Sequence, residues 1–190
     1  MKNLFRMFAA AATLAVSASA ARAQAIEGAG VSFSGGTMNY DLSGTGNTPA
    51  LALRADFPFS SIFRVEAGVV AAKPDQQFGD DPTFIIPEVQ LQAQLPLGRV
   101  APYLGAGVGM TRQFESTVNA RSDLALSAGA GARVALAQRL AGIVDGRVHA
   151  IGDNFAGTTA EVSVGLRWRL GGSPSQTATA SAVRTLPALR

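Results

Sequence analysis

The stretch Pro87-Glu88-Val89-Gln90-Leu91-Gln92-Ala93-Gln94-Leu95 decides the fold class, because its residues alternate strictly in character. Each odd position is apolar or proline, and each even position is polar. Side chains of a β-strand point alternately to opposite faces, so this period of two predicts a strand with one apolar and one polar face. Similar alternation recurs at 51–57, 63–69 and 161–170. The sequence therefore predicts an all-β protein built from amphipathic strands.

Along the whole chain the alternation predicts eight strands, joined by connections that are alternately short and long. The expected strands cover residues 26–34, 49–57, 62–72, 85–95, 100–110, 123–136, 139–150 and 159–170. Longer connections, which contain the Gly, Asn, Asp and Thr that favour loops, are expected at 35–48, 73–84, 111–122 and 151–158. This arrangement is typical of a transmembrane β-barrel. We therefore expect an eight-stranded antiparallel up-and-down transmembrane β-barrel over 24–170, with short periplasmic turns and longer extracellular loops.

The N-terminus has the pattern of a secretory signal peptide over residues 1–23. Lys2 and Arg6 precede an apolar run from Met7 to about Val16, and Ala21-Arg22-Ala23 resembles a cleavage site. The run is shorter than the ~20 residues that a membrane-spanning helix needs. Removal of this segment would lower the basic residues from 16 to 13, which equals the number of acidic residues. The net charge of +3 thus lies in the segment to be removed, and nucleic-acid binding has no support.

Composition excludes several classes of site. The chain of 190 residues is long enough for one domain with its own core, and it contains no cysteine and a single histidine, His149. Disulfide frameworks, thiolate metal sites and multi-histidine zinc sites are therefore excluded. We expect no cofactor and no metal.

Alternation alone does not decide which face is inside, because a soluble barrel that binds a small apolar ligand has the same pattern with the faces reversed. Beyond residue 23, Lys73 is the only lysine, and arginine pairs better than lysine with buried carboxylates. The polar face also carries charges of both signs, which indicates a packed, ion-paired interior. The expected lumen network is Arg54, Asp56, Arg64, Glu66, Glu88, Gln90, Gln92, Tyr103, Arg133, Asp145, Arg147, His149, Glu161, Arg167 and Arg169.

Small and aromatic residues favour the membrane interpretation further. Glycines on the polar face would leave room for large inward side chains; they are Gly105, Gly107, Gly109, Gly129 and Gly131. The aromatic residues fall near strand ends or in loops, which predicts two girdles at the membrane interfaces. The girdle at the short turns includes Phe57, Phe63, Tyr103 and Trp168, and the girdle at the long loops includes Phe33 and Phe84. Tyr103 is thus assigned to both a girdle and the lumen network.

At this level the sequence resembles the small eight-stranded outer-membrane barrels of the OmpA/OmpX type. The resemblance lies in Pro102 to Gly109, in Asp145-Gly146-Arg147 and in the closing stretch from Val162 to Leu170, and it covers about 26–170. It implies a location in the outer membrane, both termini in the periplasm, contact with outer-membrane lipids, and contact with the barrel assembly machinery and periplasmic chaperones during biogenesis. One departure is that Trp168 is followed by Leu170 and by the tail 171–190, whereas such chains usually finish their last strand with an aromatic residue. The composition of the tail predicts a flexible periplasmic segment.

The expected function follows from the size of the barrel. Eight strands enclose an interior that side chains just fill, so no open aqueous channel is expected. We expect a structural or surface-binding protein, acting in adhesion or envelope integrity through its loops. His149 is followed by Ala150 and Ile151, which breaks the His-x-Ser motif of the lipid A deacylase barrels, and no enzyme activity is expected. A narrow channel, a lipid-modifying enzyme and the soluble ligand-binding barrel are the alternatives.

Overall fold

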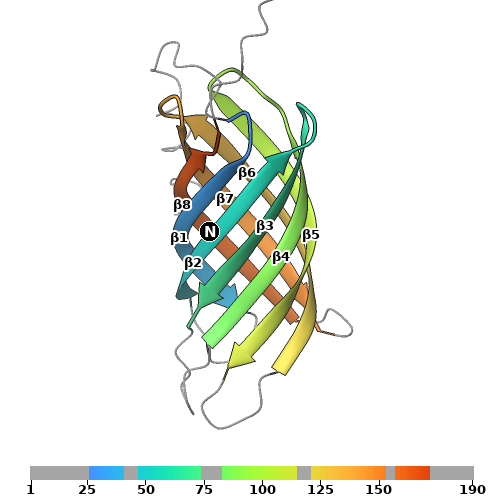
Figure 1. The fold of residues 1–190 in the computed structure, drawn as a ribbon. Helices are drawn as coiled ribbons and strands as arrows, with labels where there is room; N and C mark the ends of the chain where they lie inside the picture. Colours follow the sequence, from blue (N-terminus) through green and yellow to red (C-terminus); the bar gives the residue numbers. More distant parts are fainter. Residues whose placement is uncertain (1–25, 41–46, 74–82, 115–120, 153–156, 172–190) are drawn as a thin grey trace, which may run out of the picture.

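The computed structural model describes residues 26–40, 47–73, 83–114, 121–152 and 157–171, which form one closed antiparallel barrel (Figure 1). Each strand pairs with its neighbours in sequence, and the first pairs with the last. The described residues include no helix of the length and apolarity needed to cross a membrane. The strands are β1 (Gly30–Tyr40), β2 (Asn47–Pro58), β3 (Phe63–Ala72), β4 (Thr83–Gln94), β5 (Val100–Phe114), β6 (Arg121–Ala135), β7 (Leu140–Ile151) and β8 (Gly157–Arg169). The predicted fold class is confirmed.

The two ends of the barrel differ in their connections. Short turns join β2 to β3, β4 to β5 and β6 to β7, at the upper end in Figure 1. In the first of these turns the Ser60 hydroxyl accepts hydrogen bonds from the backbone N–H groups of Ile62 and Phe63, and in the second Gly98 has a positive φ of 68°. We call this end the short-turn end and the opposite end the long-loop end.

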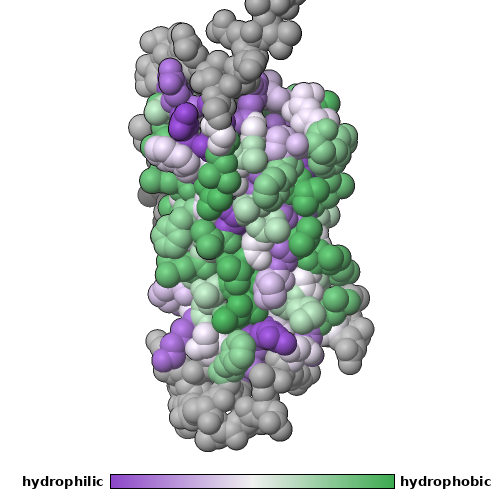
Figure 2. Space-filling view, viewed as in Figure 1, coloured by the Kyte–Doolittle hydropathy of each residue, from purple (hydrophilic) through white to green (hydrophobic). Residues whose placement is uncertain are grey.

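The apolar face of the barrel is its outer face. In β4, Glu88, Gln90 and Gln92 are buried, whereas Val89 and Leu91 between them are about half exposed. Figure 2 shows apolar side chains over most of one side of the wall, with polar side chains gathered toward the two ends. This arrangement is that of a membrane barrel, and it is the reverse of a soluble barrel with an apolar ligand cavity.

The predicted boundaries of the first strand were wrong. β1 starts at Gly30 and continues to Tyr40, whereas the sequence predicted a strand over 26–34 and a loop from 35. Gly35-Gly36 suggested a loop, but a Cβ at Gly36 would lie 2.0 Å from the carbonyl oxygen of Val162 in β8. Gly36 is therefore required by the close approach of two strands, not by a turn.

The lumen is also less uniformly polar than predicted. Two apolar clusters lie inside the barrel, one on the inward face of β1 to β4 toward the long-loop end and one at the short-turn end. The first is Met38, Ala50, Ala52, Val70, Ala72, Phe84 and Ile86, and the second is Ile26, Ala101, Ala135 and Ala141. Several members are alanines, which fit either face of a strand and so give no signal in the alternation. The charged residues are thus packed together with apolar side chains in the same interior.

Candidate functional site

The charged layer inside the barrel is the candidate site. All 15 residues predicted for the lumen network lie inside, and each is at most 5% exposed. They come from β2 to β8, and each occupies an inward position in the alternation of its strand. The barrel therefore brings together ionisable side chains that are more than 100 residues apart in sequence.

Arg147 of β7 is at the centre of this layer. Its guanidinium contacts Glu66 of β3 at 2.5 Å and Asp145 of β7 at 2.5 Å, and it also pairs with Glu88 of β4. Arginine presents several donors in a fixed planar arrangement, so one side chain can serve three carboxylates. Arg147 thus ties two opposite parts of the wall together.

Arg54 of β2 makes the corresponding link to the closing strand. It pairs with Glu161 of β8 at 2.7 Å and donates to the Ser34 hydroxyl of β1 at 2.9 Å. Its Nε lies 3.8 Å from Glu66, which joins this pair to the carboxylates around Arg147. The contacts cross the β1–β8 seam, where the barrel closes.

Arg133 of β6 packs against both polar and aromatic groups. Its guanidinium lies 4.2 Å from the ring centre of Tyr103, donates to Gln92 at 2.5 Å and lies 3.5 Å from Glu66. The Tyr103 hydroxyl donates to Asp145. A cation over an aromatic face is attracted by the ring quadrupole, most strongly where water is excluded.

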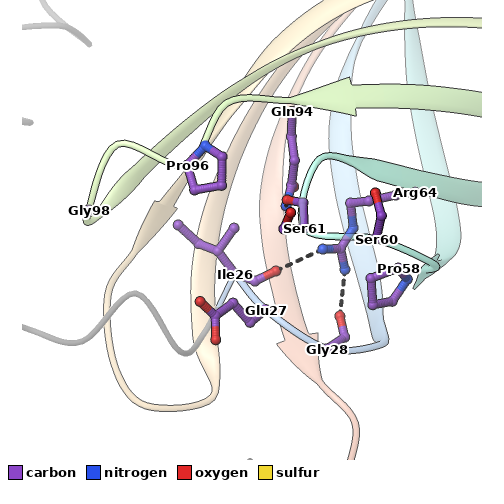
Figure 3. A pocket seen from close by; sticks show the side chains of 10 residues that line it. All are labelled: Ile26, Glu27, Gly28, Pro58, Ser60, Ser61, Arg64, Gln94, Pro96 and Gly98. Carbon is purple, nitrogen blue, oxygen red and sulfur yellow. Dashed lines mark hydrogen bonds between the residues drawn. The ribbon is translucent and has the colours of Figure 1, made fainter.

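The short-turn end of the lumen is closed by the residues that precede β1. Asp56 accepts from Arg64 and from Arg167, and both arginines also donate to the carbonyl oxygen of Gly28. Arg64 donates to the carbonyl oxygen of Ile26 at 3.0 Å, as Figure 3 shows. The Ile26 side chain is 3% exposed and belongs to the apolar cluster at this end. A small cavity of about 170 Å³ remains beside it. The sequence predicted a strand from residue 26, and this contact was not predicted.

His149 lies between two carboxylates of the same layer. Its Nδ1 is 3.9 Å from Glu88 and its Nε2 is 3.8 Å from Glu161. The cross-strand partners of His149 are Ser127 of β6 and Thr159 of β8, and neither hydroxyl is hydrogen-bonded to the imidazole ring. A hydroxyl nucleophile needs a base within hydrogen-bond reach. Within the described ranges, His149 has no such contact, and no group of three or more His, Cys, Asp or Glu residues is arranged to hold a metal ion.

The aromatic residues are arranged differently from the two predicted girdles. Phe57, Phe63 and Trp168 point outward at the short-turn end, as predicted. Phe33 also points outward, but it is the fourth residue of β1 and pairs with Leu53 and Leu166, so it lies nearer the short-turn end than the long-loop end. Phe84 and Tyr103 are 8% and 4% exposed and face the lumen, so their assignment to a girdle was wrong.

The room that glycine was predicted to provide is present. A Cβ at Gly131 would lie 2.5 Å from the Tyr103 hydroxyl oxygen, and a Cβ at Gly129 would lie 2.9 Å from Cγ of Arg147. Contacts below 3.0 Å force a neighbour to move, so these inward glycines are needed by the large side chains opposite them. This prediction is confirmed.

Comparisons with known proteins agree with this geometry. The model of the family described as "Outer membrane protein beta-barrel domain" matches residues 8–168. No match was found among curated protein sequences.

Among solved structures, Neisserial surface protein A (NspA) aligns with a TM-score of 0.64 at 16% identity, covering 76% of this chain and 100% of that chain. Ail, the attachment invasion locus protein of Yersinia pestis, aligns at 0.54 and 17%, covering 76% and 99%. OprG from Pseudomonas aeruginosa aligns at 0.51 and 15%, covering 75% and 97%. These structures share the fold, and the family match extends over most of the sequence. The chain therefore belongs to the outer membrane protein beta-barrel domain family.

Proposed function

We propose that this protein is a closed scaffold in the outer membrane that binds partners at the cell surface through its long-loop end, without conducting ions and without catalysis. In this proposal residues 1–23 are a removed signal peptide, both termini lie in the periplasm, and the long-loop end faces outward. Periplasmic chaperones and the barrel assembly machinery handle the chain before it inserts.

The observation that carries the proposal is a polar collar at the long-loop end. Most outward residues there are exposed and polar, in contrast to the apolar residues nearer the middle of the wall, and the exposed aromatic residue Phe114 lies among them. The polar members are Thr37, Asn39, Asn47, Arg112, Ser122 and Thr158. β5 and β6 have 15 residues each. At ~3.4 Å per residue and a tilt of ~40° they span about 39 Å, more than the ~25 Å apolar band of such barrels. In this proposal the excess length lies at the long-loop end, and the collar stands in water outside the membrane.

The packing of the lumen supports a role without transport. Arg147, Arg54 and Arg133 pair with carboxylates from opposite walls, and apolar clusters fill the interior on either side of them. An eight-stranded barrel has an interior just wide enough for side chains, and here the inward side chains fill it. Binding residues are often found on loops that a rigid scaffold positions, so we assign surface binding to the loops of this barrel. Ail, named for attachment and invasion, shares this fold.

Labelling of single cysteines tests the orientation. The chain has no cysteine, so Ser122→Cys in the collar and Ser60→Cys in the first short turn give two matched probes. A membrane-impermeant maleimide should label the collar variant on intact cells and the turn variant only after lysis. The opposite pattern would overturn the orientation.

Conductance and adhesion test the rest of the proposal. The purified full chain should give no stable conductance in a planar lipid bilayer, and step-like openings would overturn the closed lumen.

Cells that display the protein should bind immobilised matrix glycoproteins more than cells in which residues 74–82 and 115–120 are replaced by Gly-Ser segments of equal length. Equal binding by both would overturn the surface-binding role.

A further inference from the structure

One seam of the barrel is interrupted. β4 and β5 pair from Thr83 to Ile85 and again from Glu88 onward, but no pair joins Ile86 and Pro87 to β5. The other seven pairings run without a gap through the described residues that they join. Pro87 has no N–H group to donate to a ladder, and proline is normally kept out of central strands for this reason. β4 and β5 keep the same register on both sides of this gap, and a Cβ at Gly109 would lie 2.5 Å from the carbonyl oxygen of Pro87, so the strands stay side by side and only the ladder pairing is interrupted.

An apolar groove on the outside of the barrel runs over this interruption. It is lined by Ala67, Gly68, Pro87, Glu88, Val89, Val108, Gly109, Met110 and Leu124, and it has a volume of about 540 Å³. Three of these residues, Gly68, Glu88 and Gly109, occupy inward positions, so the floor of the groove is the sheet itself. Val89, Val108, Met110 and Leu124 are between 42% and 55% exposed and form raised sides. The groove is thus a shallow surface depression with apolar sides. The small residue Ala67 lines it together with Pro87.

The groove lies at the depth of the hydrocarbon. Ala93 of β4 pairs with Phe63, which belongs to the aromatic residues of the short-turn end. Pro87 precedes Ala93 by six residues in β4, and at ~3.4 Å per residue and ~40° of tilt this places it about 16 Å from the aromatic level toward the long-loop end, within the ~25 Å apolar band. In hydrocarbon an unfilled groove would leave its lining atoms without contact partners.

We propose that this groove binds one acyl chain of a membrane lipid at a defined position. The leaflet alone depends on the orientation given under the proposed function, which places the groove in the outer leaflet. A hydrocarbon chain is narrow and flexible, so it can follow the groove and contact both raised sides. A second copy of the protein is a poorer occupant, because two convex barrel walls touch along a line and bury little of a groove between two strands.

Native mass spectrometry of the detergent-solubilised full chain with 1-palmitoyl-2-oleoyl-phosphatidylglycerol tests this site. Wild type should retain one lipid in preference to two or more. Ala67→Phe places a large side chain in the groove, and it should lower the population with one lipid by about tenfold, equivalent to ~1.4 kcal/mol. Val164→Phe is the matched control, because Val164 is 60% exposed on the outer face of β8, away from the groove.

A second variant keeps the test independent of side-chain bulk. Pro87→Val restores an N–H group and allows the β4–β5 ladder to continue, so it should also weaken lipid retention. Loss of lipid in both variants, with the control unchanged, supports the site. Equal retention in all four proteins, or a dimer in place of the lipid adduct, would overturn it. The folded barrel should migrate differently from the boiled one in gel electrophoresis, so failure to fold is separable from failure to bind lipid. Cysteine labelling reports the orientation separately.

Discussion

Replacing Arg147 by methionine should destabilise the barrel more than any other single substitution in the charged layer. The change removes the three contacts of the guanidinium with Glu66, Glu88 and Asp145 but keeps an apolar side chain of similar length. The remaining basic groups are further away, with Arg133 3.5 Å from Glu66, and His149 and Arg54 3.9 Å and 4.0 Å from Glu88. Removal of one partner from a buried ion pair typically costs ~3–5 kcal/mol, because the other partner stays buried and uncompensated.

The free energy of unfolding can be measured by urea titration in lipid vesicles, with the single tryptophan, Trp168, as the fluorescent reporter. Arg112→Met is the control, because Arg112 is exposed in the collar and such surface changes usually stay within ~0.5 kcal/mol. Adding Glu88→Gln to Arg147→Met should recover part of the loss, since one uncompensated charge is removed. A loss below ~1 kcal/mol for Arg147→Met, within the range of exposed pairs, would refute the assignment of Arg147 as the centre of a dry network.

Three further outcomes follow from the same structure. Gly131→Ala should cost ~1–3 kcal/mol in urea titration, because its Cβ would meet a hydroxyl and a carbonyl oxygen at 2.5 Å, whereas Gly146→Ala, whose Cβ finds nothing nearer than 3.8 Å, should be near neutral. Ile86→Ala, inside the lumen, should cost ~2–5 kcal/mol, and Val89→Ala on the lipid face should cost much less because lipid takes up the space. Trp168 fluorescence should be quenched by lipids brominated near the headgroup more than by lipids brominated at the chain end, and the reverse would contradict the girdle at the short-turn end.

The alternation of side chains predicted most of the fold, because successive residues of a strand between lipid and a packed lumen face these two environments in turn. β4 is the clearest case, in which Glu88, Gln90 and Gln92 are all buried and the residues between them are exposed. The lumen network followed from the same pattern, since charged residues are expensive on a lipid face and must therefore lie inside. The preference for arginine over lysine and the glycines of the polar face were needed as well, because alternation alone fits a soluble barrel with the faces reversed.

Contacts that depend on distant parts of the chain were not predictable. Gly36 had the composition of a loop, and only its approach to β8 explains it. Phe84 was expected to face lipid near the long loops, but it packs inside with Ile86 and Met38. An aromatic residue fits both an interface girdle and an apolar cluster, so its type does not give its face. The seating of Ile26 in the short-turn end depended likewise on arginines from β3 and β8.

The ion pairs of the lumen also specify how the barrel closes. Arg54 and Glu161 are 107 residues apart, and Asp56 and Arg167 are 111 apart, so these pairs form only when β1, β2 and β8 are joined in the correct register. A slip of one residue would turn every inward side chain toward lipid. At the centre of the bilayer an arginine on the lipid face costs ~2–4 kcal/mol, and several would be displaced together. Arginines inside the barrel thus act against slips by an odd number of residues, and the specific pairs with Glu161 and Asp56 act against slips by two. This accounts for the large number of charges inside so narrow a barrel.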